Sequence, residues 1–321
     1  MSRIFGVLGL LVVLYALLGR SNPAALEWGN LTDVANIQGR YGVLTIGAAL
    51  VIIVGGIDLS LGSVVGLSAV AFGALMLKGV HPYLAGGLVL LLGAAVGGVQ
   101  GGLITLLRLQ PFLVTLCGMF IFRGAARMTG GVVSRSRVAD AQPAFAGPLD
   151  SLRWVLVGKD ADGLHFPAQF FLLLGLAVVV GFVLHRTAHG RYWYAIGHNE
   201  QAAKYAGVAV TRQRLVVYVV CSTLAALAGV LLFLDMPSVQ SDSAGANLEL
   251  YAILGAVLGG CSLRGGEGTA AGMVLGAMVL PVLENLVGLE GLSSDVIPAV
   301  IGLTLLFGTL VDELIRRRGR G

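Results

Sequence analysis

Long apolar runs alternate with short polar segments along nearly the whole chain. A run of about 20 apolar residues can cross the hydrocarbon part of a membrane as a helix. Continuous runs favour helices over the alternating strands of a membrane barrel. Ten runs are candidate spans: 4–19, 38–55, 58–78, 83–107, 109–128, 166–185, 215–235, 249–262, 267–287 and 294–311. We predict an all-α polytopic membrane protein with about ten transmembrane helices, some broken or partial, in a single domain over residues 1–321.

Composition excludes several other classes. Of the 321 residues, 56% are hydrophobic and only 12% are charged, whereas ordinary soluble domains carry about 25% charged residues. The net charge is +4, and the basic residues lie mainly in loops. Membrane lipid is therefore an expected partner, and nucleic acid is not. The three cysteines form no CxxC pair. His185 and His189 have helical spacing but no third ligand nearby, so we predict no metal site.

Basic segments predict the orientation in the membrane. The loop 186–214 and the tail 316–320 are rich in arginine, which is typical of cytoplasmic flanks. An even number of predicted spans separates them, so both can lie on the cytoplasmic side. The N-terminus is then also cytoplasmic, and the loop at about 130–165 faces outward. Residues 4–18 could alternatively be a cleaved signal peptide.

The segment LVIIVGGIDLSLGSVVG at 50–66 interrupts an apolar run with a glycine pair and one carboxylate. Such a break is tolerated in a membrane only where it is buried in protein or lines a cavity. Asp58 could cap the helix that follows, or it could be a polar group beside a translocation path, and the two roles are compatible. The residues predicted at this path or broken helix are Gly55, Gly56, Asp58, Ser60 and Ser63.

Other polar residues also fall within the apolar runs. Gln100 and Thr115 could hydrogen-bond a substrate hydroxyl or another helix, and we include both in the candidate path. Glu249 and Glu284 lie near predicted span ends, which favours solvated positions for both.

Glycine patterns add two structural expectations. GGCSLRGGEGTAAG at 259–272 resembles the break at 55–66, either as part of an internal repeat or simply as a second glycine-rich turn. Glycines recur every four residues at 93–101 and at 268–276. This spacing lets two membrane helices approach closely.

The basic loop contains a predicted short helix, within GHNEQAAKYAGV at 197–208. It would begin at Asn199 as N-cap, carry Glu200 in its first turn, include Ala203 as a helix former and stop at Gly207. With Gly197 before it, this helix could dock in the groove of a partner protein. The alternative is an interfacial helix with an aromatic belt.

The sequence lacks the common motifs for ATP binding and for hydrolytic catalysis. A P-loop requires G-x-x-x-x-G-K-[ST], and none of the three lysines occupies that frame. Neither G-x-S-x-G nor HExxH occurs. We therefore predict that the chain is not an enzyme and binds no cofactor, so any ATP would be bound by a partner subunit.

Four segments together resemble the inner-membrane permeases of ribose-type sugar ABC importers. They are GGIDLSLGSVVG at 55–66, PFLVTLCGMFIFRG at 111–124, GRYWYAIGHNEQAAKYAGV at 190–208 and AILGAVLGGCSLRGGEGTAAG at 252–272. The resemblance covers nearly the whole chain in the expected order. Segment 119–158 resembles members suggested to import furanose sugars. His198 and Cys261-Ser262 depart from the usual small residues, which leaves the particular sugar open.

The resemblance implies a function and a set of partners. The helix at 199–207 would be the coupling helix that docks into an ABC ATPase subunit, and 55–63 would line or support the path. The outward loop and region 237–248 would meet a periplasmic sugar-binding protein. Two permease chains, identical or sister, would form one transporter in the inner membrane. The alternative from another class is an ion-coupled secondary transporter that uses Asp58 or Glu284.

Overall fold

The computed structural model describes residues 2–159 and 165–291, together with Val296, Pro298, Ala299, Gly302, Leu303 and Leu306. The helices are α1 Ser2–Ser21, η1 Pro23–Leu26, α2 Trp28–Ile53, α3 Leu61–Leu77, α4 Pro82–Thr105, α5 Pro111–Met128, α6 Arg135–Ala141, η2 Pro143–Phe145, α7 Ala146–Val157, α8 Ala168–Arg186, α9 Ala188–His198, α10 Glu200–Tyr205, α11 Val210–Asp235, α12 Leu248–Leu258 and α13 Ala270–Leu289. The two short strands are β1 Val132–Ser134 and β2 Ser238–Gln240.

The predicted all-α membrane architecture is confirmed. Among the described residues, six helices are long and apolar enough to cross a membrane: α2, α4, α5, α8, α11 and α13. Helices α1, α3 and α12 coincide with further predicted spans. The expected short span at 249–262 is α12, which ends at Leu258 before a glycine pair. The predicted span at 294–311 and the arginine tail lie almost wholly outside the described residues.

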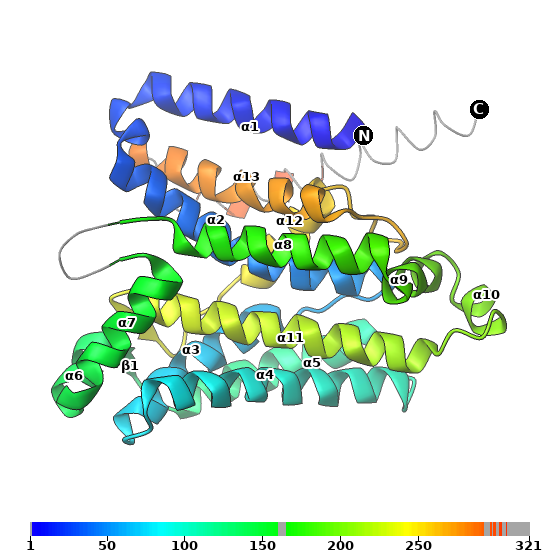
Figure 1. The fold of residues 1–321 in the computed structure, drawn as a ribbon, viewed down its shortest axis with the longest axis horizontal. Helices are drawn as coiled ribbons and strands as arrows, with labels where there is room; N and C mark the ends of the chain where they lie inside the picture. The colour runs from blue at the N-terminus through cyan, green and yellow to red at the C-terminus, as the bar shows by residue number, and fades with distance from the viewer. Residues whose placement is uncertain are drawn as a thin grey trace.

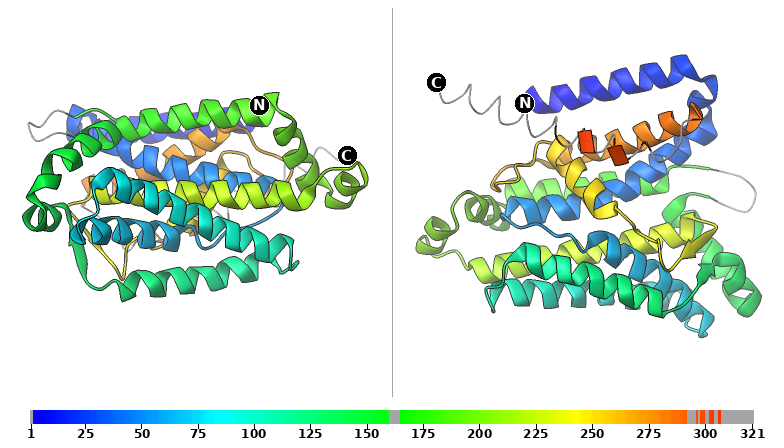
Figure 2. Two further views of the ribbon diagram at one scale, coloured as in Figure 1. Left: turned by 60° about the horizontal axis from the view of Figure 1, so that its bottom comes forward. Right: turned by 180° about the vertical axis from the view of Figure 1, so that it is seen from behind.

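Helices α2 and α11 form the centre of the bundle. Most of α2 is buried, whereas most residues of α5 and α8 are partly or fully exposed. Figures 1 and 2 show the long helices side by side, with α1 at one edge and α4 and α5 at the other. The segment that was alternatively predicted as a signal peptide forms α1. Its Leu11 and Leu14 are buried in one cluster with Val279 and Val282 of α13.

Helix α2 begins at Trp28, well before the predicted start of that span at residue 38. The sequence interpretation stopped at the polar residues, but the fold supplies each of them with a partner. Asn36 donates to the backbone of α7 and accepts from the backbone of α8. Arg40 pairs with Asp235. Polar side chains can continue a membrane helix when protein groups satisfy them.

The two ends of the bundle carry different substructures. Helices α9 and α10 lie at the end where α1 begins, and α6 and α7 lie at the opposite end (Figure 1). This placement agrees with the predicted orientation, in which the N-terminus and the basic loop share one side. The outward segment at about 130–165 is more than a loop. It contains α6, α7 and β1, and β1 pairs antiparallel with β2 in the register Val133↔Val239.

A buried ion cluster joins the middle of α2 to the end of α11. Arg40 Nη1 lies 2.7 Å from Asp235 Oδ2, and both side chains are less than 10% exposed. Lys159 Nζ lies 3.0 Å from Asp235 Oδ1 and 2.8 Å from Asp33 Oδ1. Burial alone would lower the pKa of Lys159, but the two carboxylates outweigh it and raise that pKa above its usual value. The sequence interpretation missed this cluster.

Glycines allow the central helices to approach closely, as their spacing predicted. Gly93, Gly97 and Gly101 of α4 face α11, where an added Cβ would meet its backbone or side chains. Gly272 and Gly276 of α13 face the backbone of α12 in the same way. These contacts confirm that the four-residue spacing serves helix packing at these five glycines. Gly268 does not follow the prediction, because it precedes α13 and its Cβ position lies beside Cys261 and Ile53.

Replacing Gly97 with alanine should destabilise the protein. A Cβ there would collide with the carbonyl oxygen of Tyr218 and lie 2.6 Å from Val219 Cα, so α4 and α11 must separate. We expect a loss of about 1–3 kcal/mol and a lower melting temperature in detergent. Gly98→Ala is the matched control, because nothing lies within 4 Å of its Cβ position. Equal melting temperatures for the two variants would contradict the packing role.

Candidate translocation and coupling sites

The predicted break lies between α2 and α3. Helix α2 ends at Ile53, and residues 54–60 cross to the first turn of α3 without regular structure. Gly55 has a φ of +78°, which favours glycine because it has no Cβ. At Gly56 an added Cβ would lie 2.6 Å from the hydroxyl of Tyr218. Both glycines of the pair are therefore required by the local geometry.

Every carbonyl at the end of α2 has a donor. Val54 N, Gly56 N and Gly55 N bond to the carbonyls of Leu50, Val51 and Ile52. The next two carbonyls take donors from distant parts of the chain. Gly266 N donates to Ile53 O over 2.9 Å, and Arg214 Nη2 donates to Val54 O over 3.3 Å. Two remote segments thus complete the end of this helix.

Asp58 organises the connection between the two helices. It is 2% exposed, and its Oδ1 accepts from Ser60 N at 2.8 Å and from Ser60 Oγ at 2.7 Å. The N-cap residue of α3 is Ser60, whose side chain makes no capping bond. The prediction that Asp58 itself accepts an N–H of the first helical turn is therefore wrong. The carboxylate instead stabilises the turn just before the helix.

The structure brings the predicted polar residues together. Gln100 Nε2 on α4 donates to Ser60 Oγ over 2.9 Å. Thr115 Oγ1 on α5 donates to Ile57 O over 3.3 Å. Ser63 Oγ donates to Ser60 O over 2.6 Å. We call Asp58, Ser60, Ser63, Gln100 and Thr115 the break cluster. All five are at most 2% exposed, so in this conformation they hold the connection against α4 and α5. Their contact with a passing solute stays a prediction.

Tyr218 is a neighbour of the break cluster that the sequence interpretation missed. It is 1% exposed on α11, and its hydroxyl has no hydrogen-bond partner among the described residues. A tyrosine inside a long apolar run carries no sequence signal for such a position. Cys221, one turn further along α11, directs its Sγ toward Asp58 Oδ2 at 3.8 Å.

One of the two membrane glutamates is not solvated, contrary to expectation: Glu249 is buried, whereas Glu284 is partly exposed. Glu249 is 7% exposed, and an added Cβ on Gly62 of α3 would collide with its Oε2. Glu284 accepts a hydrogen bond from the hydroxyl of Tyr41, with Oε2 at 3.2 Å. The position of Glu249 near a predicted span end gave the wrong prediction because α3 packs over that end.

The second glycine-rich segment forms a second break, and it meets the first one. Helix α12 ends at Leu258, and α13 begins at Ala270. In between, a Cβ on Gly265 would lie 3.1 Å from Gly55 Cα and 3.0 Å from Gly197 Cα. The two sequence segments that resemble each other are therefore in direct contact at the end of α2.

The basic loop is helical and touches this meeting point. The predicted short helix is α10, Asn199 Oδ1 accepts from Ala202 N at 2.9 Å as its N-cap, and Gly207 follows the helix with a φ of +80°. Glu200 lies in its first turn, and Ala203 is its buried residue. These local predictions are confirmed.

Gly197 connects the loop to both breaks. It lies in α9, a helix that the sequence interpretation did not predict. A Cβ on Gly197 would collide with Ile53 O and Gly266 N. We call Gly55, Gly197, Gly265 and Gly266 the glycine junction.

Side chains of α9 and α11 reinforce the contact with the breaks. Trp193 is buried and donates to Gln213 Oε1 of α11 over 3.0 Å. Tyr194 donates its hydroxyl to Gly268 O over 2.7 Å. Arg214 Nη1 lies 2.9 Å from Glu200 Oε2, while its Nη2 reaches Val54 O. Trp193 and Tyr194 thus bond to protein groups, whereas Tyr192 is exposed, so the alternative of an interfacial aromatic belt stays open.

These features define an integral membrane protein of the permease class. They are several membrane-spanning helices, two helix breaks that meet, and a helical loop that packs on the breaks. The chain belongs to the family described as "Branched-chain amino acid transport system / permease component", which matches residues 30–309. The family membership bears out the resemblance to ribose-type permeases that the four motifs predict.

Three relatives illustrate the similarity. The ribose import permease protein RbsC of Escherichia coli (strain K12) is 33% identical over 94% of this chain and 91% of its own length. The fructose import permease protein FruF of Bifidobacterium longum (strain NCC 2705) is 32% identical over 91% and 79%. The inner membrane ABC transporter permease protein YjfF of Escherichia coli (strain K12) is 34% identical over 86% and 80%. No solved structure matches the chain.

Substitutions at Asp58 should separate its hydrogen-bonding role from its charge. Asp58→Ala removes the acceptor of two buried donors, which costs about 1–3 kcal/mol for each unsatisfied group. Asp58→Asn keeps an Oδ1 acceptor and should retain most of the stability and most of the sugar uptake. Thermal unfolding and vesicle uptake measure both effects. Complete loss of uptake in a well-folded Asp58→Asn variant would show that the charge itself is required.

Proposed function

We propose that this chain is the membrane-spanning permease subunit of an ATP-driven ABC importer for a monosaccharide, located in the cytoplasmic (inner) membrane. The observation that carries the proposal is the direct contact between the helical basic loop and both helix breaks. The sugar class rests on the relatives, whose names assign ribose and fructose import. The likeness of segment 119–158 to furanose importers stays a prediction.

In this proposal the energy enters through α10. The chain contains no P-loop, so a separate ABC ATPase subunit would bind ATP. Tyr205 at the end of α10 is 89% exposed. An exposed aromatic residue on a short helix outside the bundle fits a docking contact. A displacement of α10 would reach the end of α2 through Arg214, and a displacement of α9 would reach it through Gly197.

The mechanism requires movement rather than covalent chemistry. The carbonyls of Ile53 and Val54 are bonded to Gly266 and Arg214. A shift of the basic loop therefore changes the donors at the first break and the position of the second break together. We propose that this shift rocks α2 and α3 against α12 and α13, so that the path opens to one side of the membrane at a time.

Further partners complete the proposed transporter. A periplasmic sugar-binding protein would meet the outward substructure at about 130–165 and region 237–248. A second permease chain, identical or sister, would form the path together with this one. Exposed apolar residues on α5, such as Phe120 and Ile121, leave that surface for lipid or for the second chain. The chain itself would catalyse no reaction.

Gentle detergent extraction of the tagged full chain should co-purify a P-loop ATPase in near-equal amount. Sugar uptake by the reconstituted complex should stop when ATP is withdrawn and should resist a protonophore. If the chain emerges without an ATPase and its sugar uptake is abolished by a protonophore, the ABC proposal fails. The ion-coupled alternative would then apply.

Arg214→Gln should uncouple the transporter without unfolding it. The ion pair with Glu200 is partly exposed, so its loss alone should cost less than about 1 kcal/mol. The buried carbonyl of Val54 also loses its donor, which adds about 1–3 kcal/mol, so the variant should melt at a lower temperature but still fold. Uptake should fall about fivefold or more if the residue transmits movement, while the ATPase still co-purifies. Arg212→Gln is the matched control, since Arg212 makes no ion pair among the described residues. Normal uptake by Arg214→Gln would exclude this transmission route.

A further inference from the structure

A groove lies beside the basic loop, at the end of the bundle where α4 and α11 meet. Its volume is about 910 Å³, and it runs between the α4–α5 turn at 106–110 and the α10–α11 connection at 206–209. Ile104, Val208 and Leu215 give it an apolar lining. The charged residues that border it are Arg108, Glu200, Lys204, Arg212 and Arg214.

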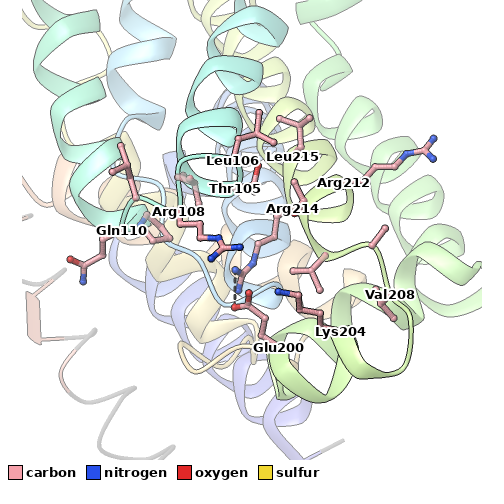
Figure 3. Close-up of a pocket in the computed structure, with 16 residues that line it drawn as sticks. Thr105, Leu106, Arg108, Gln110, Glu200, Lys204, Val208, Arg212, Arg214 and Leu215 are labelled. Carbon is pink, nitrogen blue, oxygen red and sulfur yellow. Dashed lines mark ion pairs between the residues drawn. The ribbon is translucent and has the colours of Figure 1, made fainter.

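Three cations from three separate elements converge on this groove. Figure 3 shows Arg108, Lys204 and Arg214 close together, whereas Arg212 points away from them. Glu200 is the acidic residue of the lining, and it is already paired with Arg214 at 2.9 Å. Among the described residues, Arg108 and Lys204 form no ion pair. The groove therefore holds an excess of positive charge without a protein partner.

The backbone holds Arg108 at this position. Its φ is +56°, a left-handed conformation that is uncommon for residues other than glycine. The turn between α4 and α5 thus places a guanidinium at the groove in a conformation that costs free energy. Guanidinium groups suit phosphate oxygens, because their planar donors can bond two oxygens at once.

Exposed apolar residues surround the cations. Leu106 and Leu107 are 70% and 64% exposed, and Leu109 is 43% exposed in the same turn. Phe112 and Leu113 continue this apolar surface onto α5, most of which lies on the surface of the bundle. A cationic groove joined to a lipid-facing helix offers contacts to a phosphate and to acyl chains. A free phosphate ion would use only the contacts to the cations and would leave the apolar surface uncovered.

We propose that this groove binds the headgroup of an anionic phospholipid, with the phosphate held by Arg108, Lys204 and Arg214 and the acyl chains along α5. Basic pockets between membrane helices on the cytoplasmic side are suited to such headgroups. Because Lys204 and Arg214 also belong to the basic loop and its link to α2, a bound lipid would stabilise the position of α10. The assignment to the cytoplasmic leaflet rests on the proposed orientation, whereas the binding itself does not.

The test is the thermal stability of the purified full chain titrated with a short-chain phosphatidylglycerol. Short-chain phosphatidylcholine and inorganic phosphate are titrated in parallel. Phosphatidylglycerol should raise the melting temperature with saturation, and the other two probes should not. Arg108→Gln should weaken the apparent affinity for phosphatidylglycerol about fivefold, the effect typical of one cation at an anionic lipid surface. Arg108→Lys should retain most of the affinity.

Arg212→Gln is the matched control, because it removes the same charge from the same groove edge while its side chain points away. It should leave the affinity near the wild-type value. An equal loss in Arg212→Gln would indicate a diffuse charge effect and overturn the site. Stabilisation by inorganic phosphate alone would assign the groove to a free anion. Unchanged phosphatidylglycerol affinity in Arg108→Gln, with loss of a co-purifying ATPase, would make the groove a protein-docking surface instead.

Discussion

The structure depends on how the last carbonyls of α2 are satisfied. In a membrane protein every buried backbone polar group needs a partner from the protein. Local turns supply donors for three of these carbonyls, and Gly266 and Arg214 supply the donors for Ile53 and Val54. A helix that stops inside the bundle therefore requires two segments far away in the sequence to lie against it. This requirement places the second break and the basic loop next to the first break.

Glycine makes this arrangement sterically feasible. At the glycine junction, side chains on Gly197 or Gly265 would occupy the space taken by neighbouring backbone. The same absence of side chains leaves little there that could absorb a displacement, because backbone atoms are already in contact. Packed interfaces of this kind shift between discrete arrangements rather than deforming continuously. In the proposed mechanism, a small movement of α9 would therefore reach the end of α2 and the segment between α12 and α13.

The rest of α2 is anchored more rigidly. About halfway along α2, Arg40 forms a buried ion cluster with Asp235 and Lys159, and removing one partner would leave an uncompensated charge. Beyond its inward end, the break cluster ties the connection to α4 and α5 through Gln100 and Thr115. In the proposed mechanism, movement of the basic loop would act at the glycine junction, whose Gly55 lies between these two sets of contacts along the chain.

The sequence by itself determined the membrane class, the six helices of the described residues that are long enough to cross a membrane, the two glycine-rich breaks and the short helix with its Asn199 cap. These features depend on local composition and spacing, which act over a few residues. Only the tertiary structure decided that Glu249 is buried, that α2 extends back to Trp28 and that Asp58 stabilises a turn before Ser60. The same holds for the ion cluster of Arg40 and for the meeting of the two breaks. Each of these features depends on partners remote in sequence, and local patterns carry no information about which distant groups satisfy a buried polar atom.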